Sequence, residues 1–222
     1  MDIVNRDSLA LTLDALNEMF FSQQPRTQLQ KEQIAEWIAS RQGKPGSYAN
    51  MFAPTEFDFN EGARLFTGER VQSRAATSHI LGEEACRALI LLDVPTIGVR
   101  DALDRASLGM MSRLGPTSGI YCCGKCTAAL WRHLTVGGLE DSRRRLTAGL
   151  RFLKTRRDDE GRWKTFPFYY TLLVLSEIDL PLAVEEMRYT SNVCERYLRR
   201  SFKDSRIAQR RRILVERVLA KC

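Results

Sequence analysis

The sequence contains no long hydrophobic run, and its amino terminus lacks the basic stretch followed by an apolar stretch that marks a secretory signal. Its apolar runs, such as ALILL at 88–92, are far too short to cross a bilayer. Six cysteines without a secretion signal do not indicate a disulfide framework. These absences predict a soluble, cytoplasmic protein without a transmembrane segment.

The composition is that of an ordinary globular protein. Of the 222 residues, 44% are hydrophobic and 27% are charged, which leaves enough apolar chain for a sizeable core. We therefore expect one compact domain or one array of repeats rather than several separate domains.

The net charge of +7 is concentrated at the carboxyl-terminal end. From Arg188 to the last residue there are 11 Lys or Arg and three acidic residues, a local charge of +8, so the rest of the chain is close to neutral. A basic end on a neutral body indicates a surface that faces a partner or a solvated terminal helix.

Three stretches of the chain share one spacing pattern. Each begins with a bulky apolar pair, has a Gly nine residues after the start of that pair, and has an aromatic residue two positions after the Gly; they are 37–48, 110–121 and 152–163. Upstream of each pair the apolar residues are spaced as in a helix, for example Ile34 and Ile38. A Gly allows the helix to end in a turn. Each stretch therefore predicts a helix, a turn and a second helix.

The second helix of each repeat is apolar on nearly all sides, as in TAALWRHL at 127–134 and FYYTLLVLSEI at 168–178. A helix of this kind must be buried, so we expect two concentric layers with the apolar helices inside. In the first repeat the second helix is delayed by a long connection at 49–76, and loops of this length are usually functional or mobile. The predicted organisation is a single domain over 1–222, with repeats at about 27–95, 96–138 and 139–180 and basic helices at 181–222.

The three turns Gly46-Ser47-Tyr48, Gly119-Ile120-Tyr121 and Gly161-Arg162-Trp163 are similar to the Gly-x-Trp turns of the α/α-toroid superfamily, which includes protein prenyltransferase β subunits and squalene or terpene cyclases. The stretch 158–178 especially resembles a prenyltransferase repeat, and the resemblance covers roughly residues 30–180. It implies an all-α fold, an α/α-toroid or partial toroid of antiparallel helical hairpins.

The resemblance also implies a function, namely the binding or transfer of an isoprenoid-like group in a central apolar cavity. An enzyme of this kind would be a transferase or lyase, and aromatic side chains would line its substrate site; the candidates are Tyr121, Trp163, Tyr169 and Tyr170. The Asp-x-Asp-Asp run of the cyclases is absent. The family's zinc ligands are an Asp two residues before a Cys and a later His. Cys126 resembles that Cys, whereas Tyr170 stands where the His is expected.

Three interpretations apply to the cysteine cluster at 122–126. In the first, Cys123 and Cys126 are zinc ligands at a helix start. The other candidates, at the start of the preceding inner helix, are His79, Glu83, Glu84 and Cys86, of which we select His79 and Glu84. In the second, the Cys-x-x-Cys is a redox dithiol, which usually occurs in a βαβ context that this sequence lacks. In the third, the cysteines are small buried residues, and this is the most favoured single interpretation. The sequence identifies no catalytic residue.

The basic end supports an alternative function. The segment 196–222 places apolar residues on one helical stripe and arginines on the other faces. A non-catalytic helical-repeat module could bind an acidic protein through such a helix. Nucleic acid is a less favoured partner, because none of the usual nucleic-acid-binding motifs is present. Apolar small molecules are the partners expected under the first function.

Overall fold

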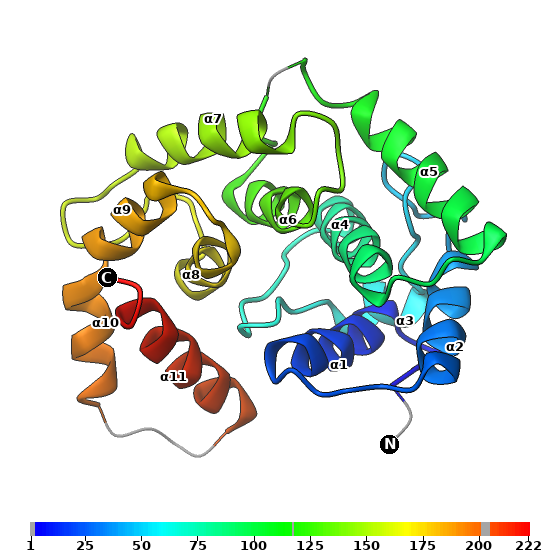
Figure 1. The fold of residues 1–222 in the computed structure, drawn as a ribbon, viewed down its shortest axis with the longest axis horizontal. Helices are drawn as coiled ribbons and strands as arrows, with labels where there is room; N and C mark the ends of the chain where they lie inside the picture. The colour runs from blue at the N-terminus through cyan, green and yellow to red at the C-terminus, as the bar shows by residue number, and fades with distance from the viewer. Residues whose placement is uncertain (1–2, 117, 201–204) are drawn as a thin grey trace.

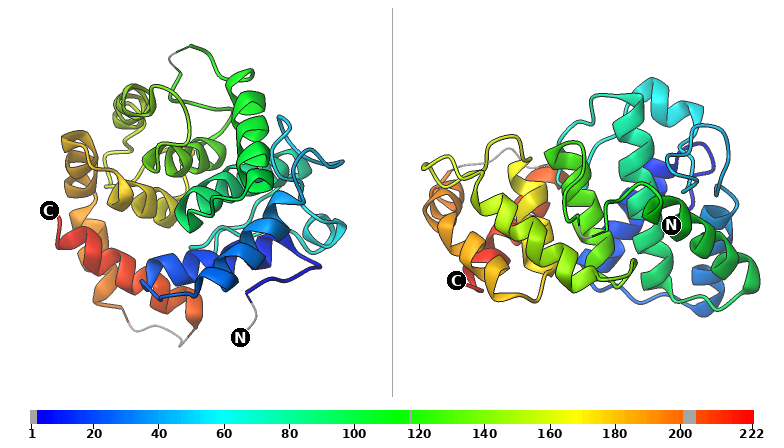
Figure 2. Two further views of the ribbon diagram at one scale, coloured as in Figure 1. Left: turned by 45° about the vertical axis from the view of Figure 1, so that its right-hand side comes forward. Right: turned by 90° about the horizontal axis from the view of Figure 1, so that it is seen from above.

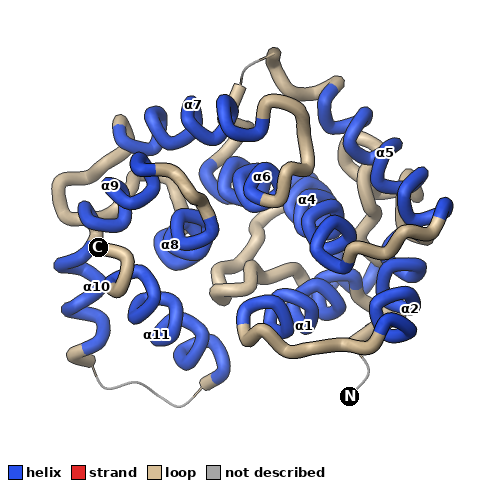
Figure 3. Tube along the Cα trace, viewed as in Figure 1, coloured by secondary structure: helices blue, strands red, loops and turns tan. Residues whose placement is uncertain are grey.

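The computed structural model describes residues 3–116, 118–200 and 205–222, and its regular secondary structure within these ranges is helical (Figures 1 and 3). It has 11 helices and no strand there; isolated β-bridges occur only in connections, as between Arg157 and Trp163. The predicted all-α fold is confirmed for the described residues.

Five helices form an inner layer in which neighbours contact one another in chain order, α1 with α4, α4 with α6, α6 with α8, and α8 with α11. Figure 1 shows them arranged around a common centre. The inner helices are α1 (Leu9–Phe21), α4 (Arg74–Leu92), α6 (Gly124–Thr135), α8 (Phe168–Glu177) and α11 (Arg206–Leu219). Every residue from Thr77 to Leu89 in α4 and from Cys126 to Leu134 in α6 is buried, as expected for helices without a polar face.

The remaining long helices lie outside this layer (Figure 1). They are α2 (Gln28–Ala39), α5 (Ile97–Met111), α7 (Ser142–Lys154), α9 (Pro181–Tyr189) and α10 (Ser191–Leu198). Each bears a buried stripe and exposed polar residues, and each packs on an inner helix, as α2 does on α4 and α7 on α6. The three repeated stretches lie where α2, α5 and α7 end and the chain turns toward α4, α6 and α8.

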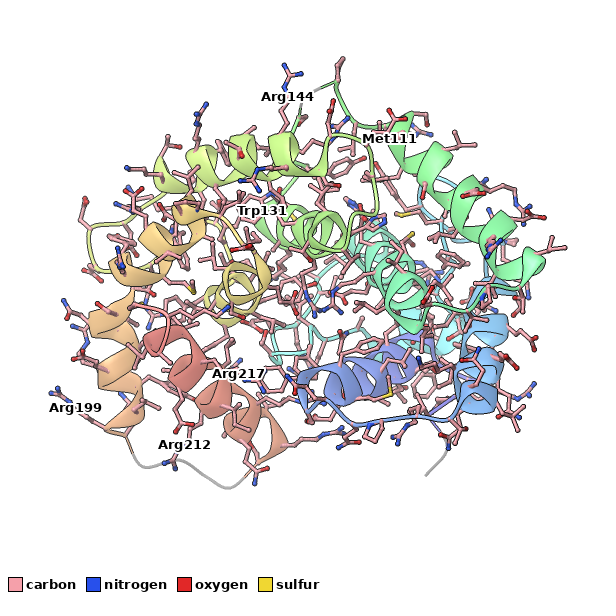
Figure 4. All side chains as sticks on the ribbon, in the orientation of Figure 1. Met111, Trp131, Arg144, Arg199, Arg212 and Arg217 are labelled. Carbon is pink, nitrogen blue, oxygen red and sulfur yellow. The ribbon has the colours of Figure 1, made fainter. Side chains whose placement is uncertain are left out.

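The Gly in the repeated turn is required for two different reasons. Gly46 and Gly161 have φ values of 89° and 87°, in the left-handed region where a side chain is strained. Gly119 has no such φ, but an added Cβ would lie 1.9 Å from the carbonyl oxygen of Arg145 in α7. Trp131 of α6 donates from Nε1 to the Gly119 carbonyl oxygen at 2.6 Å and lies between α6 and α7 (Figure 4). This hydrogen bond holds the repeated turn at Gly119 against the inner helix α6 and the outer helix α7.

The long connection between α2 and α4 is packed against the body. It contains the short helix α3 (Glu56–Glu61) and buries Met51, Phe52 and Phe66 (Figure 2, cyan segment). The Asp58 carboxylate is 2% exposed and accepts hydrogen bonds from Ser8 Oγ and from the backbone N–H groups at the start of α1. An acid from α3 therefore caps α1, where a negative charge complements the helix dipole.

Ion pairs join the last inner helix to the first. The Arg210 guanidinium of α11 is buried and donates to Asp14 at 2.7 Å and to Glu18 at 2.6 Å, both in α1. Arg210 belongs to the basic end that was predicted to face a partner or the solvent, and its charge is instead paired with two acidic residues of the same chain. Residues 201–204 of that end lie outside the described residues. No described helix is both long and apolar enough to span a membrane.

Candidate metal centre

His79 lies in the second turn of α4 and is held between two aromatic rings. Tyr48 stacks on it with ring centroids 4.6 Å apart, and Tyr121 packs edge-on at 4.1 Å. Both tyrosines are the aromatic residues of repeated turns, Tyr48 from the first repeat and Tyr121 from the second. These two aromatic residues of the repeated turns thus fix the plane of a buried imidazole.

Two sulfur atoms lie beside this imidazole. Ligand atoms of His79, Cys122 and Cys126 all lie within 4.8 Å of one another. Cys126 is buried in the first turn of α6, whereas Cys122 precedes the helix and is exposed. Burial raises the pKa of both thiols, so neither is ionised at neutral pH by its surroundings alone.

Cys123 has a different role from its two neighbours. It is the N-cap residue of α6, and its Sγ accepts a hydrogen bond from the Cys126 backbone N–H at 3.5 Å. Burial opposes ionisation of this thiol, but hydrogen bonds from the backbone N–H groups of Cys126 and Lys125 lower its pKa. The metal interpretation of the sequence named Cys123 and Cys126, whereas the structure brings Cys122, Cys126 and His79 together.

Behind His79, a buried carboxylate links the two histidines of the chain. Glu83 lies one turn along α4, is fully buried, and contacts His79 Nε2 at 3.3 Å and His133 Nδ1 at 2.5 Å. Burial raises the pKa of Glu83, but the charge and hydrogen bond of His133 and then His79 outweigh it and lower the pKa to about 2. Because Nε2 of His79 faces Glu83, Nδ1 is the ring nitrogen left for a metal.

Glu84, the other predicted ligand, faces the opposite way. It is buried in the centre of the inner layer, where it pairs with Arg132 at 2.7 Å and accepts from Asn17 and the Tyr170 hydroxyl. Arg132 also reaches Glu177 at 2.8 Å, which in turn pairs with Arg87. The helix ring is therefore filled at its centre by a network of polar and charged side chains from four inner helices.

In the described part of the chain, the predicted substrate aromatics have different contact partners. Tyr170 belongs to the central network, Tyr121 to the metal centre, and Trp163 donates from Nε1 to Glu186 of α9 at 2.8 Å. Tyr169 packs against Tyr197 of α10 and under Arg211 of α11. Beside Tyr170 and Glu84, between α1, α4 and α8, there is a cavity of only about 20 Å³. An apolar cavity that could hold an isoprenoid has no counterpart there.

Cys122 is the residue of this cluster that the sequence did not predict as a ligand, and Glu83, one of the candidate ligands, instead lies behind His79 and contacts both histidines. Cys122 precedes α6, so no helical spacing links it to Cys126, and its closeness in sequence to Cys123 and Cys126 was the available signal. Comparison with protein-family models, with curated proteins and with solved structures found no match.

Proposed function

We propose that this chain is a metal-binding protein in which His79, Cys122 and Cys126 hold a zinc ion. The observation that carries the proposal is the convergence of one imidazole and two thiols within 4.8 Å at the amino-terminal ends of two inner helices. Imidazole and thiolate are the donors that Zn²⁺ prefers, and the helix dipoles favour anionic sulfur at this end.

The surroundings fit such a group. Glu83 accepts the Nε2–H of His79, which selects the ring tautomer and makes Nδ1 a better donor, as carboxylates behind metal-bound histidines do. The two tyrosine rings exclude other orientations of the imidazole. Three protein ligands leave one position open, and when bound, zinc supplies a Lewis acid that lowers the pKa of a thiol or water at that position.

The reaction that combines this centre with the resemblance to the α/α-toroids is transfer of an isoprenoid-like group from its diphosphate ester to a thiol. The carbon–oxygen bond to diphosphate breaks, a carbon–sulfur bond forms, and diphosphate and the thiol proton are released. The two-layer ring of helices supports the toroid part of this proposal. The small space beside Tyr170 and Glu84 does not support an isoprenoid at that point of the ring, so the apolar group would lie against a surface near Cys122.

The filled centre favours a second candidate, a non-catalytic module in which zinc stabilises a turn and the outer surface binds a partner. Arg144, Arg199 and Arg212 project outward from α7, α10 and α11 (Figure 4), which fits an acidic protein. Incubating the zinc-loaded protein with farnesyl diphosphate and a thiol peptide separates the two candidates, since only the enzyme yields a thioether.

Metal analysis of the purified protein tests the proposal. We expect one zinc per chain, lost in Cys122→Ser and Cys126→Ser, while Cys123→Ser keeps it because Ser is also a good N-cap. The Co²⁺-loaded protein should show thiolate charge-transfer bands that Cys122→Ser weakens. Zinc retained by Cys122→Ser, or lost equally by Cys123→Ser, would overturn this ligand set.

A further inference from the structure

A second candidate site lies at the carboxyl-terminal ends of the inner helices, whereas the candidate metal centre lies at the amino-terminal ends of α4 and α6. A cavity of about 730 Å³ is lined by the last turns of α1, α4, α6, α8 and α11. We call it the carboxyl-end bowl, and its principal residues are Phe21, Arg87, Leu91, Arg132, Glu177 and Arg217. His79 and Leu91 are 12 residues apart on α4, about 18 Å along the helix, so the bowl is distinct from the metal centre.

The charge that lines the bowl is predominantly positive. Arg87, Arg132, Arg217 and Lys221 line it, against the single carboxylate of Glu177. Glu84, which lies deeper, pairs with Arg132 and offsets a second of these charges. The two cationic groups that remain in excess are Arg217 of α11 and Lys221, which follows that helix.

Arg87 has an unused donor. It is 6% exposed, its Nη1 donates to Asn17, and its Nη2 donates to Glu177 at 3.0 Å. Its Nε is buried and has no hydrogen-bond partner among the described residues. A buried donor without a partner is unfavourable, because it has lost its hydrogen bonds to water. Arg87 also lines the bowl, so an acceptor bound there would lie beside this side chain.

The two cations of α11 are anchored but keep spare donors. Arg217 donates one N–H to the Phe21 carbonyl oxygen at 2.8 Å and lies over the Phe21 ring at 3.9 Å. Lys221 donates to the Ser176 carbonyl oxygen at 2.6 Å. Since a guanidinium has five N–H donors and an ammonium three, each can also bind an anion.

Apolar side chains line the other parts of the bowl. Phe20 and Phe21 come from α1, Leu91 from α4 and Leu173 from α8. Leu91 is 36% exposed, although most of its helix is buried. A concave surface that joins aromatic and aliphatic side chains to a few convergent cations is typical of a small-molecule site.

We propose that the carboxyl-end bowl binds an amphipathic organic anion. Its carboxylate or sulfonate head accepts hydrogen bonds from Arg217 and Lys221 and approaches Arg87 Nε, and its apolar body lies against Phe21 and Leu91. This binding requires neither zinc nor the cysteines.

Fluorescence titration with 8-anilinonaphthalene-1-sulfonate, with decanoate as competitor, tests the proposal. We expect saturable one-to-one binding that decanoate displaces. Arg217→Ala and Lys221→Gln should each weaken it about tenfold, the loss of one charge-assisted hydrogen bond. Leu91→Glu should abolish it, because it places a carboxylate against the anion. Arg212→Ala is the matched control, since Arg212 lies on the same helix and pairs with Glu216.

Every outcome bears on the proposal. Unchanged affinity in Arg217→Ala, Lys221→Gln and Leu91→Glu, or no saturable binding, would overturn it and would leave the cations as caps for helix carbonyl groups. Displacement by sulfate but not by decanoate would overturn the amphipathic part. Melting temperature and circular dichroism of each variant separate loss of binding from loss of folding. Cys122→Ser should bind the probe as the natural chain does.

Discussion

At the scale of single residues, Glu83 and Glu84 are neighbours in α4 but have different partners. Glu83 contacts both histidines, and Glu84 pairs with Arg132 at the centre of the ring. The sequence could not distinguish them, because α4 is buried on all sides and no apolar stripe fixes its orientation. The same holds for Cys122 and Cys123, whose roles depend on which residue becomes the N-cap.

Glu83 should act as a positioning residue for the metal centre. Replacing it in Glu83→Gln removes the charge that orients His79, so zinc affinity should fall about 10–100-fold while Cys122 and Cys126 remain in place. Competition with a chromophoric chelator measures this. Glu186→Gln is the control, since Glu186 is equally buried and hydrogen bonds to Trp163 far from the centre. Equal affinities in the two variants would contradict the role of Glu83.

At the scale of elements, the repeated turns were the most predictable feature of the chain. The spacing from the apolar pair to the Gly and aromatic predicted where α2, α5 and α7 end. What the spacing did not reveal is that Tyr48 and Tyr121 meet across two repeats at His79. Nor did it reveal the central network, because Asn17, Arg132 and Glu177 come from distant parts of the chain and no local pattern links them.

Two glycines of α5 should respond in opposite ways to the same substitution. An added Cβ at Gly109 would lie 1.9 Å from the Ala49 carbonyl oxygen, whereas at Gly98 nothing lies within 4 Å. Gly109→Ala should therefore destabilise the protein by about 1–3 kcal/mol, because backbone must move apart. Gly98→Ala should stabilise it by up to about 1 kcal/mol through helix propensity. Urea unfolding measures both; a stabilising Gly109→Ala would show that α5 does not pack closely on the first turn.

At the scale of the whole molecule, the ion pairs of Arg210 in α11 with Asp14 and Glu18 in α1 connect the last inner helix to the first. We call these ion pairs the joint between α11 and α1. Arg210→Met leaves Asp14 and Glu18 without their buried partner, and we expect a loss of about 2 kcal/mol in the free energy of unfolding, reduced by the partial exposure of both acids. Arg212→Met, which removes an exposed pair on the same helix, should cost at most about 0.5 kcal/mol. Equal losses of unfolding free energy in the two variants would mean that the joint stabilises the protein no more than an exposed ion pair does.

The same joint should make stability depend on pH. Burial opposes ionisation of Glu18, but the hydrogen bond and charge of Arg210 and then Arg206 lower its pKa below the ordinary 4.5. A lowered pKa gives stability that is present above pH 4.5 and is lost as the pH falls through the folded-state value. Unfolding free energies measured from pH 7 to 3 should therefore fall in acid, and fall less in Arg210→Met. Parallel curves for the two proteins would contradict this.

The joint between α11 and α1 also has a consequence for biosynthesis. Arg210 and Asp14 are 196 positions apart, so α1 leaves the ribosome long before the arginine that neutralises its acids exists. In an open solenoid the repeats can add one after another, but here the pairing of α1 depends on a helix that is translated after all the other described helices. Nascent chains that end before α11 should therefore be captured by chaperones and cleaved by proteases at α1, and should become resistant only after α11 has been translated.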